Sequence, residues 1–165
     1  MCGIVGYLGK QKATPILITG LQRESYRGYD SSGLVVLENN KTVCLKAVGK
    51  LDQLEAKLKN CDGFGGSLGL GHVRWATHGG VTEANAHPHS DCHGNIWLVH
   101  NGIIENYQEL KQQLQQEGHV FSSETDTEVV AHLVEKFFHK NLEEAVRKAL
   151  KLVRGAYALA IMARA

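Results

Sequence analysis

The first residues of the chain, Met1-Cys2-Gly3, place a thiol directly after the initiator methionine. Met1 is most readily removed when the next residue is small, and its removal would leave a thiol and a free α-amine on Cys2. An α-amine has a reference pKa of about 7.7–8.0, so part of it is unprotonated near neutral pH. We therefore predict that Cys2 is a nucleophile with its own α-amine as base. The alternative is a small, buried second residue of a strand.

A predicted strand ends within the segment Gly71–Gly79, in a polar loop. This segment contains Arg74, which could hold a carboxylate through two parallel hydrogen bonds, as an amino-acid substrate would require. Trp75 could cover a pocket, and Thr77 and His78 add donors and acceptors beside it. The alternative is a surface arginine next to a core tryptophan.

Two further polar groups could serve the same chemistry. In Asn101-Gly102 a side-chain amide and a glycine N–H can point two donors at one oxyanion, although the dipeptide is equally typical of a turn. Asp126 lies at a predicted helix start, where capping would explain it. The functional interpretation is that its carboxylate binds a substrate ammonium.

The segment 87–93 offers four potential metal ligands, His87, His89, Cys92 and His93. Their spacing matches no standard structural zinc site, and no matching second pair follows. We therefore expect no metal and interpret the segment as a polar loop near an active site. A metal-binding or interaction domain that uses this loop is the alternative from a different class.

Composition limits the kind of protein. The 165 residues suit one domain, 43% of them hydrophobic and 21% charged. A net charge of +1 without a basic stripe argues against nucleic acid as a partner. No apolar run approaches the roughly 20 residues of a membrane helix, and no secretory signal is visible. Four cysteines without a CxxC pair predict free thiols and a cytoplasmic location.

Hydrophobic periodicity predicts both strands and helices, and hence an α+β domain with antiparallel sheet. Helix starts are expected at Thr14-Pro15, at Asn106, at a capping box of Thr125 with Glu128, and at Asn141 with Glu144. A turn is expected at Asn39-Asn40. The predicted strands cover 4–8, 34–37, 42–48, 68–75, 96–100 and 155–163, and a further helix covers 51–58.

Five segments in order resemble the class II glutamine amidotransferase family: Met1–Gly6, Tyr26–Gly33, Gly71–Gly79, His100–Asn106 and Ser123–Glu128. The residues of these motifs are most similar to those of the glutaminase domain of the glutamine–fructose-6-phosphate aminotransferases (isomerising), also called glucosamine-6-phosphate synthases. The resemblance covers essentially all of the chain. It implies the four-layer αββα sandwich of the N-terminal-nucleophile fold and no cofactor.

The resemblance also implies residue roles. Cys2 would be the nucleophile, and the Asn101 side chain and the Gly102 N–H would form the oxyanion hole. Arg74 would bind the α-carboxylate of L-glutamine, and Asp126 its α-ammonium. The other members of the implied glutamine pocket are Thr77, His78 and Trp75, the last on a mobile loop that closes over glutamine.

The implied reaction hydrolyses glutamine to glutamate and ammonia through a γ-glutamyl thioester on Cys2. In the full-length enzyme the ammonia would convert fructose 6-phosphate to glucosamine 6-phosphate. Residues 1–165 would then be a glutaminase domain that is incomplete at its C-terminus, without the sugar-phosphate isomerase domains. The full-length enzyme could also form a homodimer, and the sequence leaves this question open. The close alternatives are a domain of amidophosphoribosyltransferase or asparagine synthetase type, and an inactive fragment that retains Met1.

Overall fold

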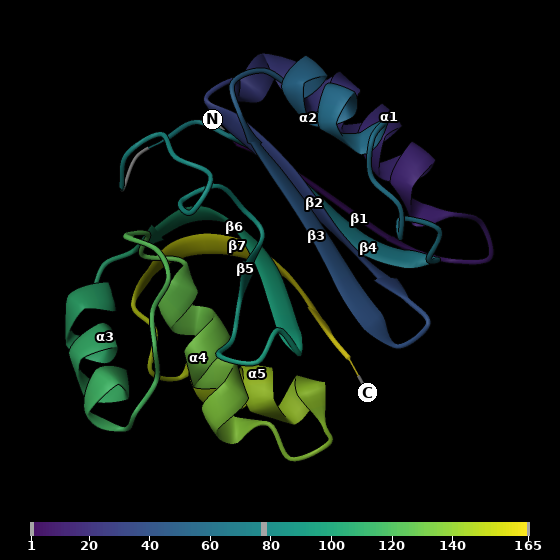
Figure 1. Cartoon of the computed structure of the whole chain (residues 1–165). Coiled ribbons are helices and arrows are strands. Elements are labelled where there is room, and N and C mark those ends of the chain that lie inside the picture. Colours follow the sequence, from purple (N-terminus) through teal and green to yellow (C-terminus); the bar gives the residue numbers. More distant parts are fainter. Residues whose placement is uncertain (1, 77–78, 165) are drawn as a thin grey trace.

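The computed structural model describes residues 2–76 and 79–164 and has four layers (Figure 1). Two antiparallel sheets face each other in the middle, with helices α1 and α2 covering one of them and α3, α4 and α5 covering the other. The expected α+β class and αββα layering are therefore confirmed. The sequence predictions that concern Thr77 and His78 lie outside the described residues.

The first sheet has the strand order β1-β4-β2-β3. Its strands are β1 (Gly3–Leu8), β2 (Ser31–Glu38), β3 (Lys41–Val48) and β4 (Leu68–Arg74). Asn39 and Asn40 join β2 to β3 with φ values of 48° and 59°, which confirms the predicted turn. β1 pairs antiparallel with β4, with Gly3 opposite Val73, so the start of the chain lies beside the end of β4.

The second sheet has the order β5-β6-β7, with β5 (His89–Ser90), β6 (Ile96–Ile104) and β7 (Gly155–Ala163). β6 is longer than the sequence predicted. Asn101 and Gly102 lie inside it, opposite Ala158 and Tyr157 of β7, so a turn at Asn-Gly is ruled out. β5 is too short to leave a periodic signal and was not predicted.

The helices are α1 (Ala13–Glu24), α2 (Leu51–Leu58), α3 (Tyr107–Gln116), α4 (Glu128–Phe137) and α5 (Leu142–Leu150), with a 3-10 turn at Ser25–Arg27. Among the residues described, none of these helices is long and apolar enough to cross a bilayer. The cap predicted at Asn141 is confirmed, because its side chain accepts a hydrogen bond from the Glu144 N–H at 3.1 Å.

α1 and α3 begin within one residue of the predicted starts at Thr14 and Asn106, and α4 begins three residues after Thr125. None of these three side chains makes the predicted cap hydrogen bond, because each has another partner. Thr14 lies inside α1 and donates to the Phe64 carbonyl at 2.7 Å. Asn106 precedes α3 but accepts from the Arg154 N–H at 2.8 Å. Thr125 does not cap α4. Its hydroxyl contacts the Ser123 hydroxyl and the His89 ring instead.

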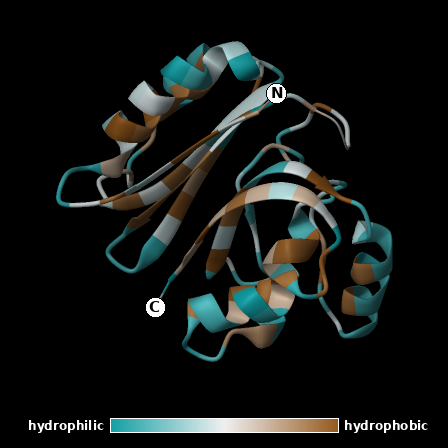
Figure 2. Cartoon of the chain, turned by 180° about the vertical axis from the view of Figure 1, so that it is seen from behind, coloured by the Kyte–Doolittle hydropathy of each residue, from teal (hydrophilic) through white to brown (hydrophobic). Residues whose placement is uncertain are grey.

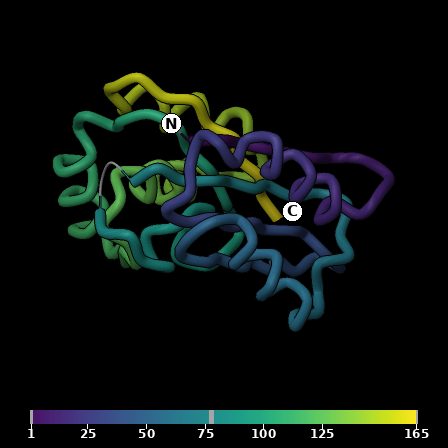
Figure 3. Tube along the Cα trace, turned by 90° about the horizontal axis from the view of Figure 1, so that it is seen from above, coloured from purple at the N-terminus to yellow at the C-terminus, as the bar shows by residue number. Residues whose placement is uncertain are grey.

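Alternation along the strands builds two kinds of core. On β2, Leu34 and Val36 pack under α1 and α2, whereas Val35 points between the sheets. The buried cluster between the sheets consists of Val35, Leu70, Val99 and Met162. Figure 2 shows hydrophobic residues concentrated in the strands and hydrophilic residues in the connecting loops. Figures 1 and 3 place the two chain ends at opposite ends of the strands.

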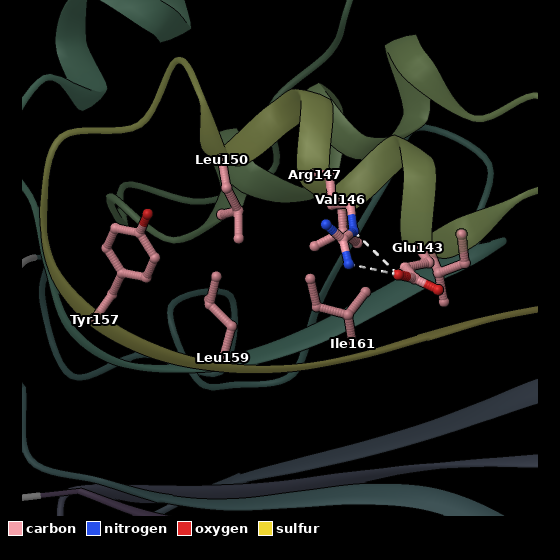
Figure 4. Close-up of a pocket in the computed structure, with 8 residues that line it drawn as sticks. Glu143, Val146, Arg147, Leu150, Tyr157, Leu159 and Ile161 are labelled. Atoms are coloured by element: carbon pink, nitrogen blue, oxygen red, sulfur yellow. Dashed lines mark hydrogen bonds and ion pairs between the residues drawn. The ribbon is translucent and has the colours of Figure 1, made fainter.

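An apolar groove lies between α5 and β7 (Figure 4). Leu150 and Val146 of α5 face Leu159 and Ile161 of β7 across it. Its charged lining residues, Glu143 and Arg147, are paired with each other at 2.8 Å. The groove offers apolar contact area but no nucleophile, so it is not a site for the predicted chemistry.

We predict that Leu70→Ala destabilises the fold by about 2–5 kcal/mol, because it opens a cavity between the two sheets. Leu70 is 5% exposed, whereas Leu8 of neighbouring β1 is 78% exposed and serves as the matched control. Urea denaturation measures both variants. Equal stability of Leu70→Ala and Leu8→Ala would contradict the assignment of Leu70 to the inter-sheet core.

Candidate active site

The layer between the sheets becomes polar near the N-terminus. Ile4 and Leu70 belong to the inter-sheet layer, and side chains two residues apart on a strand face the same way. Alternation therefore directs Cys2, His72 and Arg74 toward the second sheet. Asn101 is related to the buried Val99 of β6 in the same way, and its side chain meets that of His72. A buried polar site thus replaces the apolar core at this end.

The backbone of Trp75 holds the Cys2 thiol. Its N–H donates to the Cys2 sulfur at 3.2 Å, and the sulfur lies 3.5 Å from its carbonyl oxygen. These two contacts fix the position of the sulfur at the end of β4. The Trp75 ring is exposed and contacts Tyr29 edge to face, with 5.2 Å between ring centroids.

Asn101 is fixed at both ends of its amide. The Nδ2 donates to the Cys2 carbonyl at 3.1 Å, and the Oδ1 accepts from His72 Nε2 at 2.9 Å. The same His72 nitrogen lies 3.1 Å from the His100 carbonyl. Because both partners are acceptors, His72 must carry its hydrogen on Nε2, which also settles the orientation of the amide. His72 is therefore a positioning residue, which the sequence prediction missed because its partner is 29 positions away.

Gly102 cannot be replaced without strain. Its φ is 126°, and a Cβ built there would lie 2.0 Å from the Ala156 carbonyl oxygen. Only glycine allows this backbone conformation together with such close pairing to β7. The glycine is thus required by β6 as well as by any role of its N–H.

Arg74 and Asp126 are buried and line the same pocket as Cys2. Arg74 donates to the Gly80 carbonyl at 3.2 Å, and Asp126 accepts from the Ile104 N–H at 2.7 Å. Asp126 therefore ties its loop to β6 and does not act as a helix cap. Burial lowers the pKa of Arg74, while the negative charges of Cys2, Asp30 and Asp126 act to raise it.

The pocket is narrow, with a cavity volume of about 20 Å³, and it is partly open to solvent. Five of the predicted site residues that the structure describes line it: Cys2, Arg74, Trp75, Gly102 and Asp126. The other lining residues are His87, His100, Thr125 and Thr127. Asn101 does not line it but bonds to Cys2. One cavity thus combines a thiol with a buried cation and a buried anion.

The segment 87–93 does not gather into one metal site. His87 lines the pocket, stacks on His72 with 4.2 Å between centroids, and contacts the Thr127 hydroxyl at 3.0 Å. Cys92 points elsewhere, toward His119 and His132. The interpretation as a polar segment near the pocket fits His87. The fold divides the four candidate ligands into two pairs, His87 with His89 and Cys92 with His93.

The chain belongs to the glutamine amidotransferase domain family, whose model matches residues 72–165. It is 51% identical over 164 residues to the glutamine–fructose-6-phosphate aminotransferase (isomerizing) of Pyrococcus horikoshii and 53% identical over 161 residues to that of Thermus thermophilus. These matches cover 98% of this chain but only 27% and 26% of the relatives. The resemblance to the glutaminase part of that enzyme is therefore confirmed.

Solved structures agree with the fold. The glutamine phosphoribosylpyrophosphate amidotransferase of B. subtilis superposes with a TM-score of 0.82 at 31% identity, covering 99% of this chain and 35% of that one. A structure described as the allosteric regulatory enzyme of purine biosynthesis gives 0.85 at 31% identity, with 99% and 36% coverage. The lower identity makes the phosphoribosyl type the more distant relative.

We predict that the free energy of unfolding falls as pH decreases from about 6.5 to about 4. Burial lowers the pKa of His72 to about 4, and lowers the pKa values of His87 and His89 well below 6.5. Below pH 6.5 the unfolded chain therefore binds protons that the folded chain excludes. Each such histidine costs up to about 1.4 kcal/mol per pH unit in that range.

Urea denaturation between about pH 7 and pH 4.5 measures this loss. His139→Gln is the control, because His139 is exposed at the surface and lies outside the buried polar layer. Stability that stays flat over this range would show that the buried histidines take up protons in the folded state.

Proposed function

We propose that this domain hydrolyses L-glutamine to glutamate and ammonia, with Cys2 as the nucleophile after Met1 is removed. The observation that carries the proposal is the single pocket that combines the Cys2 thiol with buried Arg74 and Asp126. Membership in the amidotransferase family supports the same reaction.

The charges of the pocket fit the amino-acid end of glutamine. Arg74 supplies a buried cation for the α-carboxylate, and Asp126 a buried anion for the α-ammonium. Both side chains are held by backbone partners, so their charges are positioned before the substrate binds. The cavity of about 20 Å³ must widen to admit glutamine. Its side-chain amide then extends toward the Cys2 sulfur. Thr77 and His78 complete the pocket in this proposal.

In the first step the Cys2 sulfur attacks the amide carbon, and the thiol proton passes to the α-amine. The oxyanion is stabilised by the Gly102 N–H and by a hydrogen of Asn101 Nδ2, whose other hydrogen serves the Cys2 carbonyl. The C–N bond breaks as the amine returns the proton to the leaving ammonia. Water then hydrolyses the γ-glutamyl thioester, releasing glutamate and restoring the thiol.

The proposal extends to the whole protein. The relatives named glutamine–fructose-6-phosphate aminotransferase support fructose 6-phosphate as the ammonia acceptor, through domains outside residues 1–165. The chain spans about 27% of such a relative, and the apolar groove beside β7 offers a surface for more of the glutaminase domain to cover. Four free cysteines fit a reducing, cytoplasmic compartment.

We predict that Cys2→Ala abolishes glutamine hydrolysis, because no other group in the pocket can form the thioester. Glutamate release and intact mass after treatment with a γ-electrophilic glutamine analogue measure this. The unsubstituted chain, with Met1 removed, should gain one adduct. Cys61→Ser is the control and should behave like the unsubstituted chain, because Cys61 is exposed and does not line the pocket. Substantial turnover by Cys2→Ala would refute the assignment.

We predict that Asn101→Ala lowers kcat by about a hundredfold or more, because one oxyanion donor is lost. Asn60→Ala, at the exposed end of α2, is the matched control. Circular dichroism checks that both variants are folded. A change confined to KM would assign Asn101 to substrate binding, against the oxyanion role.

A further inference from the structure

A second group of reactive side chains lies outside the glutamine pocket. Cys92 comes from the turn between β5 and β6, His119 follows α3, and His132 and Glu135 lie on α4. Their four potential metal-binding atoms all lie within 4.8 Å of one another. None of the four residues lines the pocket that contains Cys2.

The distances match a tetrahedral zinc site. The Cys92 sulfur lies 3.6 Å from His119 Nδ1 and 3.5 Å from His132 Nδ1. Zinc bonds of about 2.3 Å to sulfur and about 2.0–2.1 Å to nitrogen place such ligands about 3.5 Å apart in a tetrahedron. Glu135 Oε2 is 3.3 Å from His132 Nδ1 and 2.9 Å from His119 Nδ1, so the second of these pairs has to separate slightly. The remaining pairs of ligand atoms lie within 4.8 Å, so zinc binding requires small side-chain adjustments.

The chemistry of the donors also fits Zn²⁺. A thiolate, two neutral imidazoles and a carboxylate are ligands that zinc prefers, and their two negative charges balance the ion. His132 turns its other nitrogen, Nε2, toward Glu128 Oε1 at 3.5 Å. A carboxylate behind a metal-binding histidine fixes its ring and raises its basicity.

The group is accessible to an ion from solvent. Cys92 is exposed, and Cys92, His119 and Glu135 line a surface cavity. His132 and Glu128, in contrast, are buried. The site would therefore close around an ion that enters beside Cys92. The competing explanation is a metal-free cluster in which Glu135 accepts hydrogen bonds from its neighbours.

We propose that Cys92, His119, His132 and Glu135 bind one Zn²⁺ as a structural site. Four protein ligands leave no open position for a substrate, which separates this site from catalysis at Cys2. The expectation of no metal, drawn from the spacing of His87–His93, considered only neighbours in sequence. Three of the four proposed ligands lie outside that segment.

Such an ion would join three segments next to the glutamine pocket. Glu128, behind His132, accepts hydrogen bonds from the N–H groups of Ser122 and Ser123, both at 2.7 Å. This segment leads directly to Asp126. Zinc would therefore stabilise the segment that leads to Asp126 without contacting the substrate.

The test begins with the 165-residue chain freed of metal by a chelator. One equivalent of Zn²⁺ is added, unbound ion is removed by gel filtration, and the metal is measured by mass spectrometry. We expect about one Zn²⁺ per chain and a rise in Tm of about 5 °C or more at saturating zinc. Co²⁺ in place of zinc should show thiolate-to-metal charge transfer and the visible bands of a tetrahedral site.

Cys92→Ser and His119→Gln should lose the zinc and the rise in Tm. Cys61→Ser and Cys2→Ala are the controls and should keep the bound zinc and the rise in Tm. Unchanged zinc binding by Cys2→Ala excludes binding at the pocket thiol. The proposal is overturned if the unsubstituted chain retains no zinc above the buffer blank, or if Cys92→Ser retains as much. If Cys92→Ser does not fold, a Co²⁺ spectrum of the unsubstituted chain without thiolate bands overturns the proposal by itself.

Discussion

The antiparallel pairing of β1 with β4 is the constraint on which the site depends. It places Gly3 opposite Val73 and thereby brings the first residues of the chain to the end of a buried strand. The Cys2 sulfur then meets the backbone of Trp75, and the Cys2 carbonyl meets the amide of Asn101 on the other sheet. A shift of one residue in this pairing would turn the Cys2 side chain to the helix-covered face.

The pairing of β1 with β4 also places polar side chains at one end of the layer between the sheets. Buried polar groups are costly unless they are hydrogen-bonded, and here some imidazole nitrogens and hydroxyls bond to one another. The Nδ1 atoms of His72 and His87 are buried without a partner among the described residues. The Thr127 hydroxyl lies 3.0 Å from His87 Nε2 and 2.9 Å from His100 Nδ1. Neutral histidines suit this layer because they bond to carbonyls and hydroxyls without adding charge beside Arg74. The same neutrality makes the fold sensitive to acid.

The segment 122–128 connects the two sites of the molecule. On one side its Asp126 and Thr127 line the pocket that contains Cys2, and on the other Glu128 contacts His132 of the proposed zinc site. The expected capping box would have used Thr125 and Glu128 locally, at the start of α4. The Thr125 hydroxyl instead contacts His89, 36 positions away, and Glu128 accepts from the N–H groups of Ser122 and Ser123, just upstream. The predicted capping box is therefore replaced by one tertiary contact and one different local set of hydrogen bonds.

The sequence by itself determined the class of the domain, most of its strands and helices, and the residues expected to carry chemistry. Those properties follow from periodicity, turn residues and ordered motifs, which are local. Only the tertiary structure decided that β6 continues through Asn101 and Gly102, that His72 orients the Asn101 amide, and that Cys92 lies beside His119, His132 and Glu135. Each of these depends on strand pairing or on side chains that are distant in sequence, and short-range spacing carries no information about either.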